Sequence, residues 1–306
     1  MTIALSILPL VLTILCGYGL VQTQVLPRDQ WGGIETLSFR LLIPAVLIKS
    51  IALSDLSSAA FGPMIFALIS ASAVSAGILV TFRWMRTPKA LPNPVFTTVF
   101  QTATRWNAFI ALAAAELFVG GEAVALIAMS MAVLIPLINI VNIIVLSLFG
   151  SATPSAGLIL KTVLNNPLVQ ACAIGLILNL SGILMPNFIV QTLDLIGRAA
   201  LGVGILAVGA AIKPRRLFNT SSAMWFGVLA RVICGPIIFL TGAEYMGLGP
   251  LEQAVGVIVM AAPAASNGYI VAKKMGGDAD LYADILAWQI LLSMLILPAF
   301  MVLLST

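Results

Sequence analysis

Two short stretches place polar side chains inside apolar surroundings at related positions of the chain. Residues 105–111 read RWNAFIA and residues 265–271 read ASNGYIV, so that Asn107 in N-A-F-I aligns with Asn267 in N-G-Y-I. Arg105, two residues before Asn107, carries a guanidinium that can donate two parallel hydrogen bonds to a carboxylate. These residue types therefore predict a site that binds a small organic anion, not one that transforms it.

The chain lacks the side chains on which most metal and hydrolytic sites depend. It contains no histidine, and its three cysteines, Cys16, Cys172 and Cys234, lie in apolar stretches without C-x-x-C spacing. A zinc or haem site would lack its usual ligands, and serine–histidine catalysis is excluded. We therefore expect no enzyme activity, no bound metal and no cofactor, apart from a coupling proton or sodium ion.

The composition places most of the chain in lipid. Of the 306 residues 61% are hydrophobic and 8% are charged, whereas a soluble domain carries roughly 25% charged residues. The mean hydropathy is +1.12. The net charge is +4, but the basic residues lie in short loops, which argues against a nucleic-acid partner. Because the N-terminal segment lacks a basic start and a cleavage signature, we expect a membrane helix there rather than a signal peptide.

Apolar runs of about 20 residues, the length that crosses the hydrocarbon core, recur along the chain. The predicted fold class is an all-α polytopic membrane protein. Its ten predicted transmembrane helices are residues 3–22, 34–53, 61–82, 94–117, 122–149, 158–180, 187–211, 222–242, 252–272 and 281–304.

Basic residues distinguish the two sides of the membrane. Every odd-numbered loop contains lysine or arginine and no even-numbered loop does. Cytoplasmic loops are enriched in these residues, so we expect a bacterial-type inner-membrane protein with both termini on the non-cytoplasmic side. The ten basic loop residues are Arg28, Arg83, Arg86, Lys89, Lys161, Lys213, Arg215, Arg216, Lys273 and Lys274.

Five helices in each half imply that the two halves enter the membrane in opposite directions. Residues 1–150 and 151–306 show weak self-similarity, because PLVLTILCGYGL resembles PLVQACAIGLIL at an offset of 158, which pairs Gly17 with Gly175. Apolar helices share letters by chance, but ordered matches at offsets of 156–160 favour duplication. We predict two inverted five-helix repeats, a design that recurs in transporters.

Helices 4 and 9 carry residues that favour an interruption within the membrane. Pro263 in helix 9 lacks an N–H, and Ser266, Asn267 and Gly268 then permit an unwound stretch. Helix 4 contains the polar run QTATRWN. Backbone groups freed by such breaks must face a wet cavity or a ligand. The alternative is a proline kink that packs against neighbouring helices.

These features resemble the auxin efflux carrier family, which shares its architecture with the bile acid sodium symporters. The resemblance covers essentially the whole chain and is carried by LIPAVLIKSIALSDL, NNPLVQACAIGLIL and AAPAASNGYIVAKKMGGDADL. It implies that helices 4 and 9 cross as unwound segments in a transport domain of helices 3–5 and 8–10, beside a scaffold of helices 1, 2, 6 and 7. It also implies organic-anion substrates such as auxin or dicarboxylates.

The resemblance assigns roles to single residues. It makes Asn107 and Asn267 the crossover asparagines, and it places Lys49 beside the substrate cavity. Many relatives carry a proline in the helix 4 crossover, where alanines follow Asn107 here, so helix 9 carries the stronger sign of a break. The candidate substrate-binding residues are Arg105, Asn107, Asn267, Ser266, Tyr269 and Lys49, with Pro263 and Gly268 as crossover and hinge residues.

Charges inside the predicted spans need partners, because burying one at a helix centre costs about 2.5–3.5 kcal/mol on insertion scales. Arg105 either binds the anion or pairs with Glu116 or Asp284, and Lys49 either faces the cavity or extends toward the outer surface. Asp194 and Arg198, at positions i and i+4, are expected to neutralise one another. Two further cations without a motif around them are expected to serve structure or interfaces: Arg40 and Arg231.

The coupling ion stays open between three possibilities. Glu116 and Asp284 are the acids best placed to bind a coupling proton. Ser266 and nearby backbone carbonyls could instead hold sodium, and uncoupled transport is the third option.

Taken together, these features predict a secondary transporter with elevator-type alternating access. Its predicted substrate is a small organic anion, either auxin-like or a mono- or dicarboxylate. An anion channel and a membrane sensor that binds without moving its ligand are the alternatives. The direction of transport stays open, and the expected partners are the anion, membrane lipid and, as one option, a second copy in a homodimer.

Overall fold

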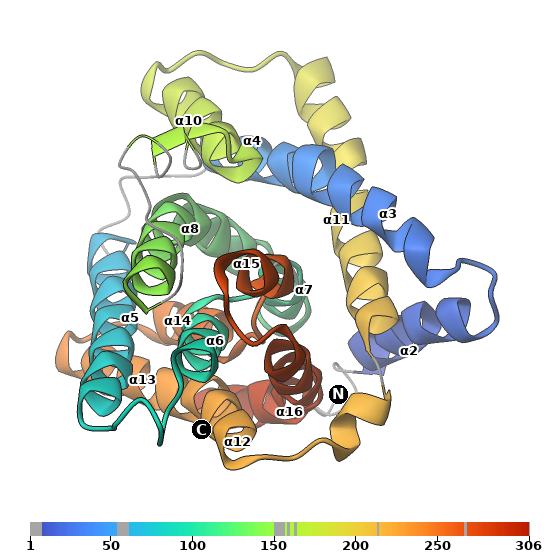
Figure 1. Ribbon diagram of the computed structural model, residues 1–306. Coiled ribbons are helices and arrows are strands. Elements are labelled where there is room, and N and C mark those ends of the chain that lie inside the picture. The colour runs from blue at the N-terminus through green and yellow to red at the C-terminus, as the bar shows by residue number, and fades with distance from the viewer. Residues whose placement is uncertain are drawn as a thin grey trace. The chain divides into compact units, whose positions relative to one another are not determined.

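The chain is helical throughout the part that is described. The computed structural model describes residues 8–53, 61–149, 157, 160–161, 164–212, 214–265 and 268–305, which form helices and turns without a strand (Figure 1). The elements are α2 (Leu8–Gln22), η1 (Arg28–Gln30), α3 (Trp31–Leu37), η2 (Ser38–Leu42), α4 (Ile43–Leu53), α5 (Phe61–Trp84), α6 (Asn93–Thr104), α7 (Ala108–Phe118), α8 (Gly121–Phe149), α10 (Pro167–Leu180), α11 (Asn187–Ala211), η3 (Pro214–Phe218), α12 (Ser222–Leu229), η4 (Ala230–Cys234), α13 (Gly235–Tyr245), α14 (Pro250–Ala261), α15 (Gly268–Met275) and α16 (Ala279–Ser305).

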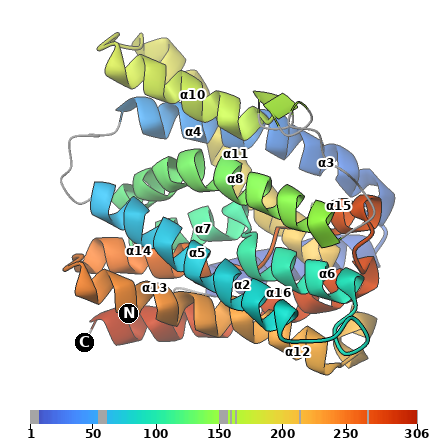
Figure 2. The same ribbon diagram turned by 60° about the vertical axis from the view of Figure 1, so that its left-hand side comes forward.

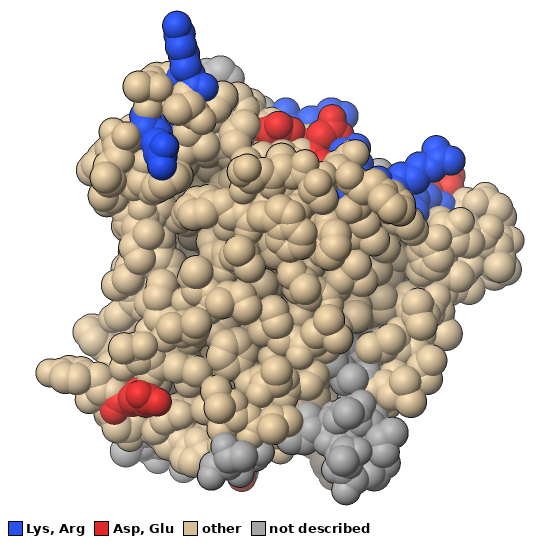
Figure 3. Space-filling view, turned by 90° about the horizontal axis from the view of Figure 1, so that it is seen from below, with Lys and Arg blue, Asp and Glu red and all other residues tan. Residues whose placement is uncertain are grey.

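Six helical stretches of the described residues are long and apolar enough to cross a membrane: Arg28–Leu53, Gly62–Trp84, Gly121–Phe149, Asn187–Ala211, Ser222–Tyr245 and Ala279–Leu304. In the face drawn in Figure 3 the charged residues gather near the margins, and a broad area carries none, as contact with lipid requires. These are the helices of a polytopic membrane protein. The other four predicted spans contain shorter or interrupted helices, so ten crossings stay a prediction.

Two of the long stretches contain a π-helical turn shortly before a proline. The turns Ser38–Leu42 and Ala230–Cys234 precede Pro44 and Pro236. Proline has no N–H to donate, so the regular α-helical ladder fails at that point. In the second turn the Gly235 N–H donates to the carbonyl oxygen of Ala230, five residues earlier in the chain. Such turns are frequent at functional sites, and the second one contains the buried Arg231.

The chain forms two compact units, each with its own core. The first contains α2 to α4, α7, the beginning of α8, α10 and α11, and the second contains α5, α6, the end of α8 and everything from η3 onward. Their bounds are Met1–Ser58, Phe109–Pro136 and Lys161–Ile212 for the first unit, and Ala59–Ala108, Leu137–Leu160 and Lys213–Thr306 for the second.

In the first unit, glycines allow helices to approach until their backbones touch. The helix α2 packs along α11, and α4 packs along α10, the latter pair lying side by side in Figures 1 and 2. A Cβ atom added to Gly17 would lie 2.0 Å from the carbonyl oxygen of Leu206, and one added to Gly209 would lie 2.0 Å from that of Ile14. No side chain fits at either position, so these glycines fix the separation of α2 and α11.

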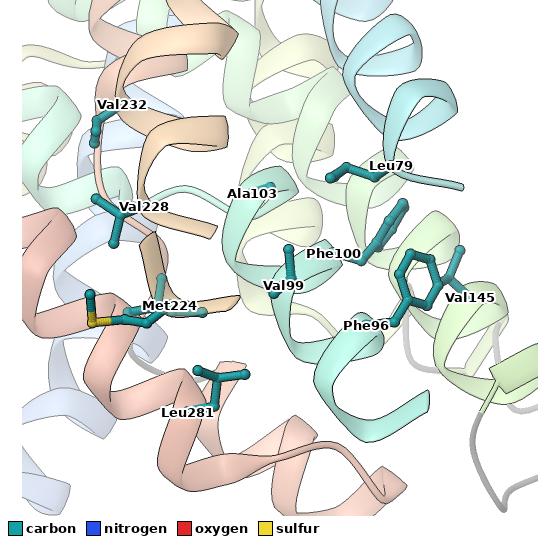
Figure 4. Packing of buried hydrophobic residues seen from close by; sticks show 11 residues of the cluster. Leu79, Phe96, Val99, Phe100, Ala103, Val145, Met224, Val228, Val232 and Leu281 are labelled. Carbon is teal, nitrogen blue, oxygen red and sulfur yellow. The ribbon is translucent and has the colours of Figure 1, made fainter. Parts of the chain in front are cut away.

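The core of the second unit holds α6 in place up to its last turn. Phe96 and Phe100 of α6 are buried and lie 6.0 Å apart between ring centroids. Figure 4 shows them beside Leu79 of α5 and Val145 of α8, while Val99 points toward α12 and α16. The whole buried cluster consists of Leu79, Phe96, Val99, Phe100, Ala103, Val145, Met224, Val228, Val232, Leu281 and Ile285.

The glycine contacts predict a selective loss of stability. Gly17→Ala and Gly209→Ala should each destabilise the protein by about 1–3 kcal/mol, the usual effect of overpacking, measured as a lower Tm of the purified protein in detergent. Gly19→Ala is the control on the same helix, because a Cβ there meets nothing within 4 Å. Equal Tm values for Gly17→Ala and Gly19→Ala would contradict the close packing of α2 and α11.

Candidate functional site

Helix 4 is interrupted at the predicted residues. The helix α6 ends at Thr104, the backbone at Arg105 is extended (φ −73°, ψ 149°), and α7 begins at Ala108. The last helical bond runs from the Arg105 N–H to Gln101 O at 2.9 Å. Arg105, Trp106 and Asn107 are all buried. The predicted break is therefore confirmed, although no proline follows Asn107.

Helix 9 is interrupted as well. The helix α14 ends at Ala261, Ala262 leaves the helical conformation (φ −57°, ψ 138°), and α15 begins at Gly268. Pro263, which cannot donate a backbone hydrogen bond, follows directly and is buried. The break predicted in helix 9 is confirmed. Two of the candidate site residues, Ser266 and Asn267, lie outside the described residues.

The two breaks are joined by a backbone hydrogen bond. The N–H of Asn107 donates to the carbonyl oxygen of Pro263 at 2.7 Å. This contact brings together two of the residues singled out from the sequence, which are 156 positions apart in the chain. Each break thus satisfies a backbone group that the other has freed.

Gln289 of α16 binds both breaks from a third helix. Its Nε2 donates to the carbonyl oxygens of Thr102 on α6 and Gly227 on α12, both at 3.0 Å, and its Oε1 accepts from the Ala264 N–H at 2.8 Å. Thr102 O is one of the carbonyls that an ended helix leaves without a partner. Gln289 could not be recognised from the sequence, because a single glutamine in the apolar run ILAWQILL carries no spacing signal.

Arg231, in the π-helical turn before Pro236, also bonds to both breaks. Its guanidinium donates to Ala103 O near the end of α6 and to Val259 O and Ala262 O at the end of α14, with Nη1 to Ala103 O at 3.3 Å and Nε to Ala262 O at 2.8 Å. The side chain is fully buried. Arg231 was expected to have a structural role, and these three carbonyl groups are its partners.

The start of α15 is shaped by Tyr282 of α16. The Tyr282 hydroxyl donates to Ala265 O at 2.6 Å. A Cβ atom at Gly268 would lie 2.1 Å from that hydroxyl oxygen, so glycine is required there for steric reasons besides any role as a hinge. The candidate residue Tyr269 follows Gly268 on α15 and is half-buried.

Arg105 is buried with a neutral partner. Its Nη1 donates to Asn139 Oδ1 of α8 at 2.9 Å, and this amide acceptor carries no negative charge. Within the described part of the chain the buried Nε of Arg105 has no hydrogen-bond partner, and the same holds for both amide atoms of Gln101 and for Nε1 of Trp106. Polar atoms buried in this way call for an explanation, and a ligand is one.

One of the two acids considered as alternative partners of Arg105 forms an ion pair with another arginine. Asp284 is buried on α16 and lies 3.2 Å from Nη1 of Arg216, whose Nη2 lies 2.5 Å from Asp280 Oδ1. The hydrogen bond to Asp280 is the main reason that the pKa of Arg216, outside the membrane spans, is raised above its usual value. Glu116 is exposed on α7. Proton coupling through Asp284 or Glu116 stays a prediction.

Lys49 belongs to the first unit, where it contacts a carboxylate. Its Nζ bonds to Asp194 Oδ1, and Arg198 Nε donates to Asp194 Oδ2 at 2.7 Å. The expected pairing of Asp194 with Arg198 is confirmed, and Lys49 joins it from α4. Asp194 therefore links α4 to α11, and a role for Lys49 in substrate binding stays a prediction.

The described residues contain no cluster of three or more His, Cys, Asp or Glu side chains that could hold a metal ion. The polar groups gathered at the breaks are amides, two guanidiniums, a phenol hydroxyl, an indole N–H and backbone groups, which donate and accept hydrogen bonds. Their chemistry suits the binding of a solute.

Comparison with known families shows what the chain is similar to. A family model described as "Membrane transport protein" matches residues 125–301, more than half of the chain. The matched region includes the second break, Arg231 and Gln289, whereas Arg105 and Asn107 precede it. No curated protein matches the chain.

The bonds of Gln289 predict a large loss of stability on its removal. Gln289→Leu breaks three buried hydrogen bonds, so we expect a loss of about 2–3 kcal/mol, measured by titration of the purified protein with sodium dodecyl sulfate. Gln191→Leu, at an exposed position of α11, is the control and should unfold as the unchanged protein does. An equally small effect of both substitutions would mean that Gln289 does not hold the breaks.

Proposed function

Because the chain belongs to the membrane transport protein family, we propose that it is a secondary transporter that carries a small organic anion across the membrane. The resemblance to the auxin efflux carriers, drawn from the residues alone, is confirmed by this membership. Transport by an integral membrane protein, rather than catalysis, is the activity of such a family.

The observation that carries the proposal is a set of buried polar atoms at the first break that have no hydrogen-bond partner among the described residues. Gln101, Arg105 and Trp106 lie within six consecutive residues, and each has a buried polar atom that no described residue bonds. Arg105 adds a permanent positive charge. A carboxylate is the ligand that would accept hydrogen bonds from a guanidinium, an indole N–H and an amide at once.

The helix that follows the break adds to this preference. α7 runs for 11 residues from Ala108, and its N-terminus carries the positive end of the helix dipole. Half-helix N-termini near the bilayer midplane bind anionic groups of substrates in several transporter folds. Buried positive charge and the dipole therefore favour the same class of solute, a mono- or dicarboxylate or an auxin-like acid.

The packing of the first unit supports two inverted repeats. Gly17 on α2 faces the carbonyl oxygen of Leu206 on α11, and Gly175 on α10 faces that of Ile48 on α4, 3.3 Å from where its Cβ would lie. Gly17 and Gly175 are 158 positions apart in the chain, and so are Ile48 and Leu206. An exchange of the two halves turns one contact into the other, which is what a two-fold axis relating them would do.

The division into two units supports elevator-type motion. α6, α14, α15 and α16, which form or hold the breaks, belong to one unit, and α2, α3, α4, α10 and α11 belong to the other. Units with separate cores can move as rigid bodies. The division falls at Ala108/Phe109 and at Pro136/Leu137, so α7 and the first part of α8 group with the proposed scaffold helices.

The experiment that tests the function is counterflow in proteoliposomes. Purified protein is reconstituted and loaded with a panel of unlabelled carboxylates, and the entry of labelled carboxylate is followed. Saturable uptake driven by an unlabelled solute inside identifies a carrier. A channel would give flux without counterflow, and a sensor would give binding without flux, so either result contradicts the proposal.

Arg105 should determine affinity for the anion. Arg105→Gln removes the charge and should raise the Kd or KM for the transported carboxylate by about 10- to 100-fold, the effect of losing a charge-assisted hydrogen bond. The matched control is Arg215→Gln, at an exposed position of η3, which should leave uptake unchanged. If Arg105→Gln binds the carboxylate as tightly as the control does, the anion is held elsewhere.

A further inference from the structure

One buried guanidinium collects carbonyl groups from the ends of both interrupted helices. Arg231 donates to Ala103 O in the last turn of α6, and to Val259 O and Ala262 O where α14 ends. All three acceptors belong to backbone segments at a helix C-terminus, where carbonyl groups lose their partners in the next turn. The side chain is 2% exposed, so it is the protein, and not water, that satisfies them.

The place that Arg231 occupies attracts a cation for two reasons. The C-terminus of each half-helix carries the negative end of its dipole, and two such ends meet here. Carbonyl oxygens freed by an interrupted helix can also replace the hydration shell of an ion. In several transporters with broken helices, half-helix C-termini and unwound carbonyls coordinate the coupling sodium ion or proton.

Arg231 meets both requirements without an ion from solution. A guanidinium keeps its positive charge at every physiological pH and has five N–H donors. Gln289 bonds to Thr102 O and Ala264 N in the same two breaks, so a permanent cation and a neutral amide both bond to the backbone there. The carbonyl oxygens that a sodium ion would use already accept hydrogen bonds from Arg231.

We propose that Arg231 is a built-in cation that takes the place of a coupling sodium ion at the crossover. The protein then needs no sodium at this point to keep the breaks together. For its transport readout this inference rests on the proposed function, but the requirement for a positive charge applies to the folded protein alone. When the Arg231 side chain is removed, the breaks should still need a positive charge, and a small cation from solution should be able to supply it.

The test measures the Tm of the purified full-length protein without substrate, in sodium chloride, in choline chloride, and in guanidinium chloride far below denaturing concentration. The unchanged protein should give one Tm in sodium and choline. In choline, Arg231→Ala should melt roughly 5–10 °C lower, as expected for the loss of several buried bonds, and sodium or guanidinium should restore at least half of the difference. Choline is too large to enter the space left by the side chain.

Arg40→Ala is the matched control, because Arg40 lies in the other π-helical turn but is exposed. Its Tm should be the same in all three salts. If Arg231→Ala melts equally low in all three salts, or if the unchanged protein loses stability when sodium is replaced by choline, the proposal is wrong. These readings need no transported solute, so they stand whatever counterflow shows.

Two further variants keep the test decisive if Arg231→Ala does not fold. Arg231→Lys keeps the charge with fewer donors, and Arg231→Gln keeps donors without the charge. We expect Arg231→Lys to be as indifferent to the choice of salt as the unchanged protein is, and Arg231→Gln to be stabilised by sodium over choline. Uptake by the two variants should follow the same order, with Arg231→Lys indifferent to the choice of salt and Arg231→Gln more active in sodium than in choline. Salt indifference of Arg231→Gln, or sodium dependence of Arg231→Lys, would overturn the role of the charge.

Discussion

An interrupted helix inside a membrane leaves backbone N–H and carbonyl groups that lipid cannot satisfy, and the second unit is arranged around this constraint. The ends of α6 and α14 lie where Arg231 and Gln289 can bond to their free carbonyls, and the breaks bond to each other through Asn107 and Pro263. The bonds come from α16 and from the π-helical turn beside Pro236. The breaks are therefore held by the helices around them.

The polar groups at the crossover fall into two sets. The freed carbonyls of α6 and α14 that accept from Arg231 and Gln289 serve the structure, whereas Gln101, Arg105 and Trp106 each retain a buried atom without a partner among the described residues. The first set explains how the helices can stop inside an apolar environment. In the proposed function, the second set contacts the solute. Because the two sets use different side chains, rigidity of the site and affinity for the solute can be altered separately.

Much of this arrangement could be predicted from sequence, and the rest depends on contacts between distant residues. The breaks followed from local features, namely Pro263 with its small neighbours and the polar run that ends in Asn107. Arg231 and Gln289 could not be assigned, because their partners lie up to 128 and 187 positions away and a lone polar residue in an apolar helix carries no spacing signal. Asp284 was one of the two acids that the alternative interpretation paired with Arg105, but it pairs with Arg216, which lies in the predicted loop after residue 211.

A density map of the purified protein with its best-transported carboxylate would test the central claim most directly. The account predicts that α6 stops at Thr104 and α14 at Ala261, with a carboxylate oxygen about 3 Å from the Arg105 guanidinium and Arg231 between the two helix ends. Unbroken helices through Asn107 and Pro263, or an anion bound away from Arg105, would contradict it.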